Sequence, residues 1–134
     1  MGPSSLSRWI AFAGAVLIAA IVAASLVPAG WQVRLGLHWL VEHFLAYFSV
    51  TSIFCLAWPR PTVVAAVLIP FAVLLEVLQG LTPDRVADFP TALFAAAGVA
   101  SAALVADLAI TLRKRAQGRR RRAESLKSPP AGAA

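Results

Sequence analysis

The stretch TVVAAVLIPFAVLLEVLQ, residues 62–79, decides the fold of this chain. Glu76 is its single charged residue, and a helix needs about 20 predominantly apolar residues to cross the hydrocarbon core of a membrane. Three other apolar runs of similar length lie at 9–27, 37–58 and 89–112. Prolines and glycines fall between the runs, where they end helices at little cost. The sequence therefore predicts an all-α membrane protein built on a four-helix transmembrane bundle.

The composition supports the same class. The chain has 134 residues, of which 60% are hydrophobic and 13% charged, and its mean hydropathy is +0.78. Soluble domains carry roughly a quarter charged residues. Cys55 is the only cysteine, so no intrachain disulfide can form, and its apolar neighbours predict a buried, unreactive thiol. The run at 9–27 is longer than the apolar region of a signal peptide, which favours a retained helix.

Most of the charge follows the last apolar run. The net charge is +6, and we divide the chain into a four-span domain at 1–112 and a basic tail at 113–134. The tail carries eight basic residues: Arg113, Lys114, Arg115, Arg119, Arg120, Arg121, Arg122 and Lys127. With almost no apolar side chain to bury, it is predicted to be disordered beyond its first turn or two. A polybasic segment next to a span is typical of anionic-lipid contact, and we expect no nucleic acid because no aromatic residue is interleaved for base stacking.

The basic residues also predict the orientation. Lys and Arg concentrate on the cytoplasmic side of membrane proteins, so the tail is expected inside. Four spans then return the N-terminus to the same side. Ten of the twelve basic residues are cytoplasmic in this arrangement, namely the eight of the tail with Arg8 and Arg60. We therefore expect a multi-pass protein of the inner (plasma) membrane with both termini cytoplasmic.

Small residues recur at helical spacing in two of the runs. One stripe is Ala11, Ala15, Ala19 and Ala23; the other is Ala92, Ala96 and Ala100, with Gly98 and Ala102 beside it. Small residues let helix backbones approach closely in lipid. The pattern predicts tight packing, either within the chain or between copies, and so leaves a homo-oligomer open.

The few polar residues gather toward one side of the membrane. The second run begins where the third ends, on the outer side in this orientation, and the short Pro59–Pro61 turn predicts that these two helices lie side by side. Ionisable groups at membrane depth usually mark function. We predict a ligand-binding cleft that opens outward, with Asp88 at its rim, lined by the side chains of His43, Tyr47, Glu76, Gln79 and Arg85.

Two interpretations of this cluster stay open. An arginine can hold a phosphate or carboxylate with two hydrogen bonds, and an imidazole with acids can do general acid–base work or hold a divalent cation. The alternative is a structural network, in which Glu76 pairs with Arg85 and Asp88 caps the following helix. The sequence contains no known nucleophile or phosphate-loop motif, and we expect no cofactor and no metal ion.

The same residues resemble the VanZ-like family. The resemblance rests on Glu42–Tyr47 (EHFLAY), Glu76–Gln79 (EVLQ), and Arg85 followed by Asp88. It covers about residues 42–99 and implies a small multi-span membrane protein with an outward-facing polar cluster. The leading hypothesis is therefore a VanZ-like protein of the bacterial cell envelope that binds a lipid head group or a cell-wall precursor. A non-catalytic scaffold or oligomer subunit, and an enzyme acting on a phosphoester or glycosyl group, are the alternatives.

Overall fold

Four helices make up the fold. The computed structural model describes residues 5–26, 36–81 and 88–127, and its elements are α1 (Ser5–Leu26), α2 (Trp39–Ala57), α3 (Pro61–Gln79) and α4 (Phe89–Lys127). Each of the four is long and apolar enough to cross a membrane. The predicted all-α fold with a four-helix bundle is confirmed, and its helices begin and end within a few residues of the predicted limits except at the end of α4.

Local chemistry explains where the helices begin and end. The imidazole of His38 accepts a hydrogen bond from the backbone N–H of Leu40 and caps the start of α2. Pro61 stands in the first turn of α3, where its missing N–H costs nothing. The carbonyl oxygen of Asp88 accepts the first backbone bonds of α4, from Thr91 and Ala92. The starts of α3 and α4 agree with the turn and the cap that the sequence predicted, whereas the cap by His38 was not predicted.

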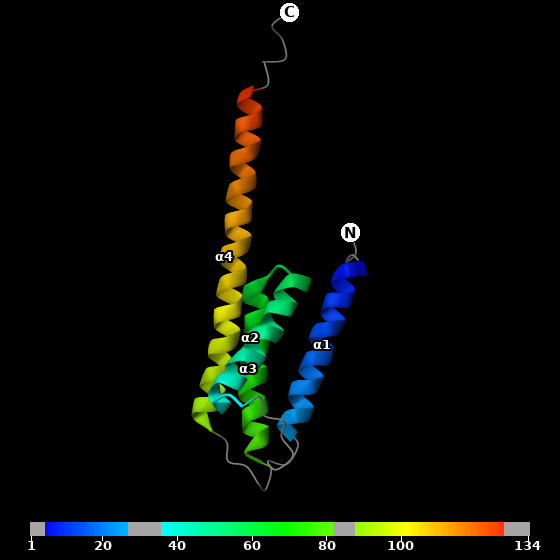
Figure 1. Ribbon diagram of the computed structural model, residues 1–134, viewed down its shortest axis with the longest axis vertical. Coiled ribbons are helices and arrows are strands. Elements are labelled where there is room, and N and C mark those ends of the chain that lie inside the picture. The colour runs from blue at the N-terminus through cyan, green and yellow to red at the C-terminus, as the bar shows by residue number, and fades with distance from the viewer. Residues whose placement is uncertain (1–4, 27–35, 82–87, 128–134) are drawn as a thin grey trace, which may run out of the picture.

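The helices run up and down in sequence order (Figure 1). The end of α1, the start of α2, the end of α3 and the start of α4 lie at one end of the bundle, which we call the cluster end. Within the described residues, α4 packs on α2 and α3, whereas α1 packs mainly on α2 and does not contact α4. Antiparallel neighbours of this kind place the polar ends of several helices at the same depth.

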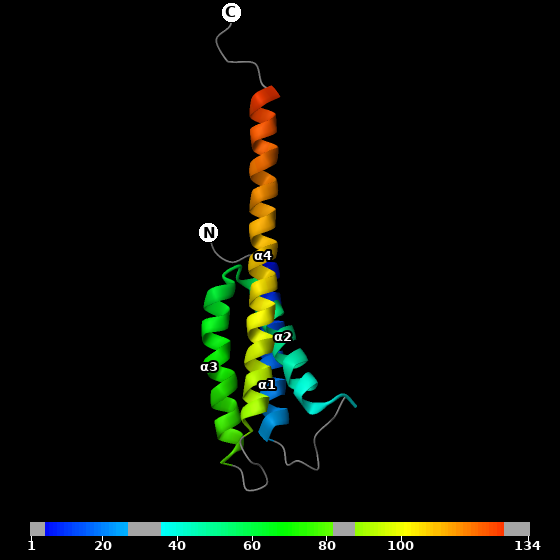
Figure 2. The same ribbon diagram turned by 90° about the vertical axis from the view of Figure 1, so that its left-hand side faces the viewer.

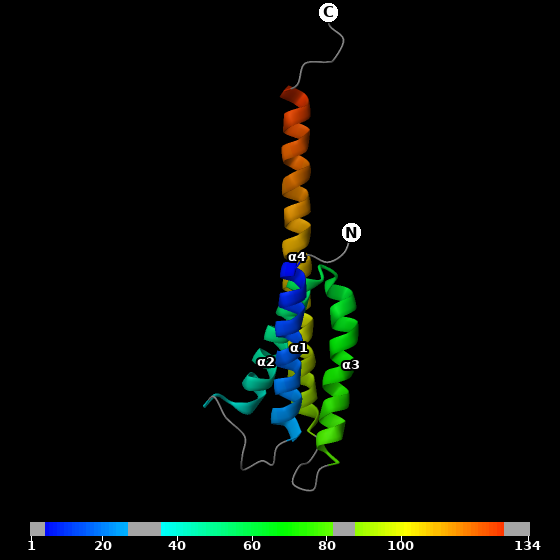
Figure 3. The ribbon, with the colours of Figure 1, turned by 90° about the vertical axis from the view of Figure 1, so that its right-hand side faces the viewer.

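The helices α2 and α3 do not pack along their whole length as expected. They contact each other only over a short stretch, and Figures 2 and 3 show them diverging from the turn that joins them, with α4 covering the space between. The physical reason is the small-residue face of α4. Because this face admits the α2 backbone, the contact between α2 and α4 is much more extensive than that between α2 and α3.

Gly98 is where α2 and α4 approach most closely. A Cβ atom at this position would lie 2.4 Å from the carbonyl oxygen of Phe44 and 3.2 Å from the backbone nitrogen of Phe48. The buried face of α4 continues through Ala95, Val99 and Ala102. The predicted stripe therefore coincides only in part with the face that packs within the chain. Of its members only Gly98 and Ala102 are buried, while Ala92, Ala96 and Ala100 are not.

The predicted alanine stripe of α1 likewise does not form the packed face. Ala15, Ala19 and Ala23 are exposed, and α1 instead contacts α2 through Gly14, where an added Cβ would lie 3.0 Å from the ring of Phe54. Cys55 is a buried free cysteine, as predicted. It belongs to a core shared by α2, α3 and α4: Tyr47, Val50, Cys55, Val64, Leu68, Ala72, Ala95 and Val99.

The prediction of a disordered tail is wrong up to Lys127. Helix α4 is 39 residues long and continues without a break to Lys127, well beyond the other helices (Figure 1). Two physical reasons account for this. Arg, Lys, Ala, Gln and Glu are good helix formers, and a helix already nucleated by the span extends at little cost. Residues 128–134 lie outside the described residues.

Candidate functional site

Glu76 is the centre of the polar residues at the cluster end. It lies in the last turn of α3 and is only 8% exposed. Its Oε1 accepts a hydrogen bond of 2.9 Å from the backbone N–H of Asp88, which immediately precedes α4. A carboxylate therefore links the end of one helix to the start of the next. Burying such a group is costly unless hydrogen bonds satisfy it.

Asp88 and Thr91 extend this link into α4. The hydroxyl group of Thr91 donates to Oδ2 of Asp88 at 3.3 Å, and Thr91 is buried. Asp88 is thus held through both its backbone N–H and its side chain, which agrees with the interpretation as a helix cap. Thr91 was not predicted, although a hydroxyl group three residues after a candidate helix cap is on the same face of the helix and can reach it.

Tyr47 joins the group from α2. Its side chain is 3% exposed, and its phenol lies near enough to the Glu76 carboxylate for an electrostatic interaction. Gln79, one turn beyond Glu76 on the same helix, is also buried. We call Tyr47, Glu76, Gln79, Asp88 and Thr91 the polar cluster. Three helices contribute to it, so it exists only in the folded bundle.

The described interactions of His43 are with Trp39 of its own helix. Its Nδ1 lies 2.8 Å from the carbonyl oxygen of Trp39, and its ring meets the Trp39 indole edge to face. A carbonyl can only accept, so Nδ1 carries the hydrogen and Nε2 is the remaining basic atom. The neighbouring Glu42 accepts a hydrogen bond from the backbone N–H of Leu37. The interactions described for His43 thus lie within α2, and none joins it to Glu76.

The predicted site is therefore only partly assembled among the described residues. Tyr47, Glu76 and Asp88 come together, and Gln79 lies one turn away. Arg85 lies outside the described residues. Within those residues, no group of three or more His, Cys, Asp or Glu side chains is placed to hold a metal ion. No buried side-chain nitrogen or oxygen of the described part lacks a hydrogen-bond partner, and this includes the buried atoms of the polar cluster.

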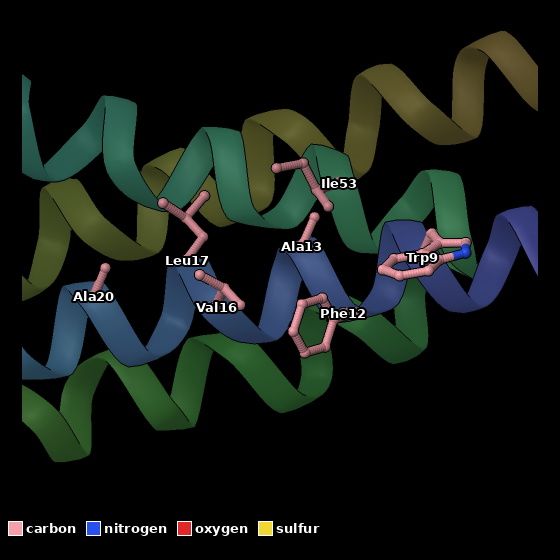
Figure 4. Close-up of a pocket in the computed structure, with 7 residues that line it drawn as sticks. All are labelled: Trp9, Phe12, Ala13, Val16, Leu17, Ala20 and Ile53. Carbon is pink, nitrogen blue, oxygen red and sulfur yellow. The ribbon is translucent and has the colours of Figure 1, made fainter.

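A concave surface lies on α1, and none of its lining residues belongs to the polar cluster. It is an open groove of about 580 Å³ on the outer surface of α1 and α2. Figure 4 shows its lining of apolar side chains: Trp9, Phe12, Ala13, Val16, Leu17, Ala20 and Ile53. Apart from the indole N–H of Trp9, the lining offers no polar side-chain group, so this surface is suited to acyl chains, as are the other exposed apolar side chains of the bundle.

These features define the class of the protein. Four helices of membrane-spanning length, with large apolar side chains on the outside and polar ones gathered between helix ends, make it a multi-pass helical membrane protein. Comparison of the chain with protein-family models, with curated proteins and with solved structures finds no match. Its function is inferred from its own residues.

Proposed function

We propose that this chain is a VanZ-like integral membrane protein that binds a polar head group at the polar cluster. The buried carboxylate of Glu76 carries the proposal. It stands in a candidate membrane span, beside Tyr47 from a second helix and Asp88 at the start of a third. Ionisable groups at this depth are expensive and usually mark a binding or transport site. The VanZ-like resemblance rests on Tyr47, Glu76, Gln79 and Asp88 among others, which are the same residues.

The chemistry of the cluster favours a ligand rich in hydrogen-bond donors. Ionised Glu76 and Asp88 only accept hydrogen bonds, whereas Gln79, Thr91 and Tyr47 both donate and accept. Amines and hydroxyl groups complement such a surface. They occur in the head groups of membrane lipids such as phosphatidylethanolamine and in the sugars of lipid-linked cell-wall precursors. Both kinds of ligand present a polar group at the edge of the bilayer, at the depth of the cluster.

The location of the ligand depends on orientation, for which we propose cytoplasmic termini. The cluster end is opposite the end from which the basic part of α4 projects (Figure 1). Because basic segments stay on the cytoplasmic side, the cluster faces the outer side of the membrane. Envelope precursors are displayed on that side.

Topology is directly testable. An alkaline-phosphatase reporter, active only outside the cytoplasm, is expected to be silent when fused after Ala134, and a fluorescent protein that folds in the cytoplasm is expected to be bright at the same position. The reason is the excess of basic residues in α4. The same pair of reporters placed in the connection between α1 and α2 should give the reverse result. A silent fluorescent protein with an active phosphatase after Ala134 would overturn the orientation.

Head-group binding is testable with purified protein in nanodiscs. Phosphatidylethanolamine and a polyprenyl-diphosphate-linked disaccharide serve as the two probes, and native mass spectrometry measures what is retained. We expect the original protein to bind one of the two probes. Glu76→Gln should bind that probe at least about tenfold more weakly, since a hydrogen bond to a charged group is worth about 1.5–3 kcal/mol. Asp107→Asn is the control, because Asp107 is an exposed acid of α4. Equal retention of both probes by the Glu76 and Asp107 variants would reject the site.

One observation favours a second candidate, a non-catalytic scaffold. Oε1 of Glu76 already bonds the backbone of Asp88, so the cluster also works as a clamp between α3 and α4. Under this hypothesis the only role of the polar cluster is to stabilise the fold. Glu76→Ala, which removes this bond, would then lower thermal stability, and neither probe would bind the original protein.

A further inference from the structure

The basic residues of α4 stand clear of the bundle. All side chains from Arg113 to Leu126 are exposed, and Figures 1 to 3 show this part of α4 projecting along the bundle axis beyond the start of α1 and the α2–α3 turn. Residues 113–127 span roughly 22 Å at 1.5 Å per residue. The last apolar side chain before them is Leu112, so the projection begins where the span ends.

The projection is strongly positive on every side. It carries the eight basic residues of the chain's C-terminal part and one acid, Glu124. At 100° per residue the basic side chains are distributed around the whole helix. The surface therefore has no apolar face for a helix of the bundle, and its charge is complementary to an anionic surface.

Gly118 divides the projection into two basic groups. Arg113–Arg115 lie next to the span, and Arg119–Arg122 lie beyond the glycine. A Cβ at Gly118 would meet nothing within 4 Å, so close packing does not explain the glycine, in contrast to Gly98. Glycine within a helix weakens it through its backbone freedom. The helix is thus easiest to bend at the point between the two groups.

We propose that α4 bends at Gly118 and that Arg119–Arg122 dock on anionic lipid head groups of the leaflet from which the helix emerges. In the straight helix, Arg119 and Arg122 stand roughly 9 and 14 Å beyond Arg113 at 1.5 Å per residue. The Debye length in physiological salt is about 8 Å, so an upright helix leaves these charges largely screened from the membrane. A bend at Gly118, roughly 8 Å beyond Arg113 at 1.5 Å per residue, instead holds all four arginines within about one Debye length of the surface. The inference rests on the orientation proposed above and does not depend on ligand binding at the polar cluster.

Full-length protein in nanodiscs provides the test. Leu126 is replaced by cysteine and labelled with a dye, while Cys55 is buried and the unsubstituted chain reports background labelling. Energy transfer to a head-group-labelled lipid is measured in phosphatidylcholine alone and with phosphatidylglycerol added. In phosphatidylcholine the dye should stay roughly 20 Å beyond Arg113, at 1.5 Å per residue. In the mixed lipid it should move to the surface, and 1 M salt should reverse the shift.

Two variants separate the charge from the bend. Replacing Arg119–Arg122 by glutamine should abolish the lipid-dependent shift, and Gly118→Ala should reduce it at least twofold while leaving thermal stability unchanged. Equal transfer in both lipids would overturn the docking and leave an upright basic helix available to a soluble acidic partner. An unchanged shift in Gly118→Ala would overturn the bend. The topology reporters read orientation separately, so failure here is distinguishable from failure of the proposed orientation.

Discussion

Gly98→Val is expected to destabilise the bundle by about 3 kcal/mol or more, at the upper end of the usual cost of overpacking. The new Cβ alone would stand 2.4 Å from the carbonyl oxygen of Phe44. The obstacle is backbone, which cannot rotate away as a side chain can. The variant must therefore push α2 from α4 along the most extensive contact of the structure. Thermal unfolding of detergent-purified protein, followed by loss of helical signal and by aggregation, measures the effect.

The other glycines provide matched controls for this prediction. Gly14→Ala meets only the ring of Phe54, at 3.0 Å, and a ring can shift, so we expect a loss of about 1 kcal/mol or less. Gly118→Ala meets nothing and should be neutral or slightly stabilising, since alanine is the better helix former. Equal stability of all three variants would mean that α2 and α4 do not approach as described.

Glu76→Ala is expected to be the most damaging change in the polar cluster. It removes the acceptor for the backbone N–H of Asp88, and an unsatisfied buried donor costs about 1–3 kcal/mol. Glu76→Gln keeps a side-chain oxygen that can accept the same bond, so its loss should be about 1 kcal/mol or less. Thermal unfolding of the two variants, beside Asp107→Asn as the exposed control, separates the hydrogen bond from the charge.

Two outcomes would contradict this account of Glu76. If Glu76→Gln is as unstable as Glu76→Ala, the charge is essential to the fold and the hydrogen bond to Asp88 is not the main contribution. If Glu76→Gln and Arg85→Gln each lower stability and the double variant restores it, the two residues form a structural ion pair. The assignment of Glu76 to a binding site would then be wrong.

The residues that make up the site could be predicted from the sequence, but their hydrogen-bond partners could not. Tyr47, Glu76, Gln79 and Asp88 were found because polar residues are rare in the apolar runs and because antiparallel helices return to the same end. The described partner of Glu76 is a backbone N–H, a group that every residue except proline carries and that leaves no mark in a sequence. The hydrogen bond between Nδ1 of His43 and the backbone carbonyl of Trp39 could not be predicted either, because every residue carries such a carbonyl.

The four helices and their order follow from the residues along the chain alone. Apolar runs of membrane-spanning length, separated by Pro59, Pro61 and Gly80, depend only on local composition, which is why 62–79 corresponds so closely to α3. Local composition also contained the signal for the extension of α4 to Lys127. The prediction failed there because a high charge was taken as a sign of disorder, although the same residues favour a helix once one has begun.

The rotation of each helix about its axis and the choice of its neighbours depend on packing in three dimensions. In a chain that is apolar nearly all round, periodicity does not distinguish the face toward lipid from the face toward protein. The alanine stripes therefore do not coincide with the faces that pack within this chain, and their packing against another copy stays a prediction. The short turn between α2 and α3 wrongly predicted that these two helices pack along their whole length. The steric fit at Gly98 brings α2 against α4, because in lipid the closest backbone approach, rather than apolar burial, selects the partner of a helix.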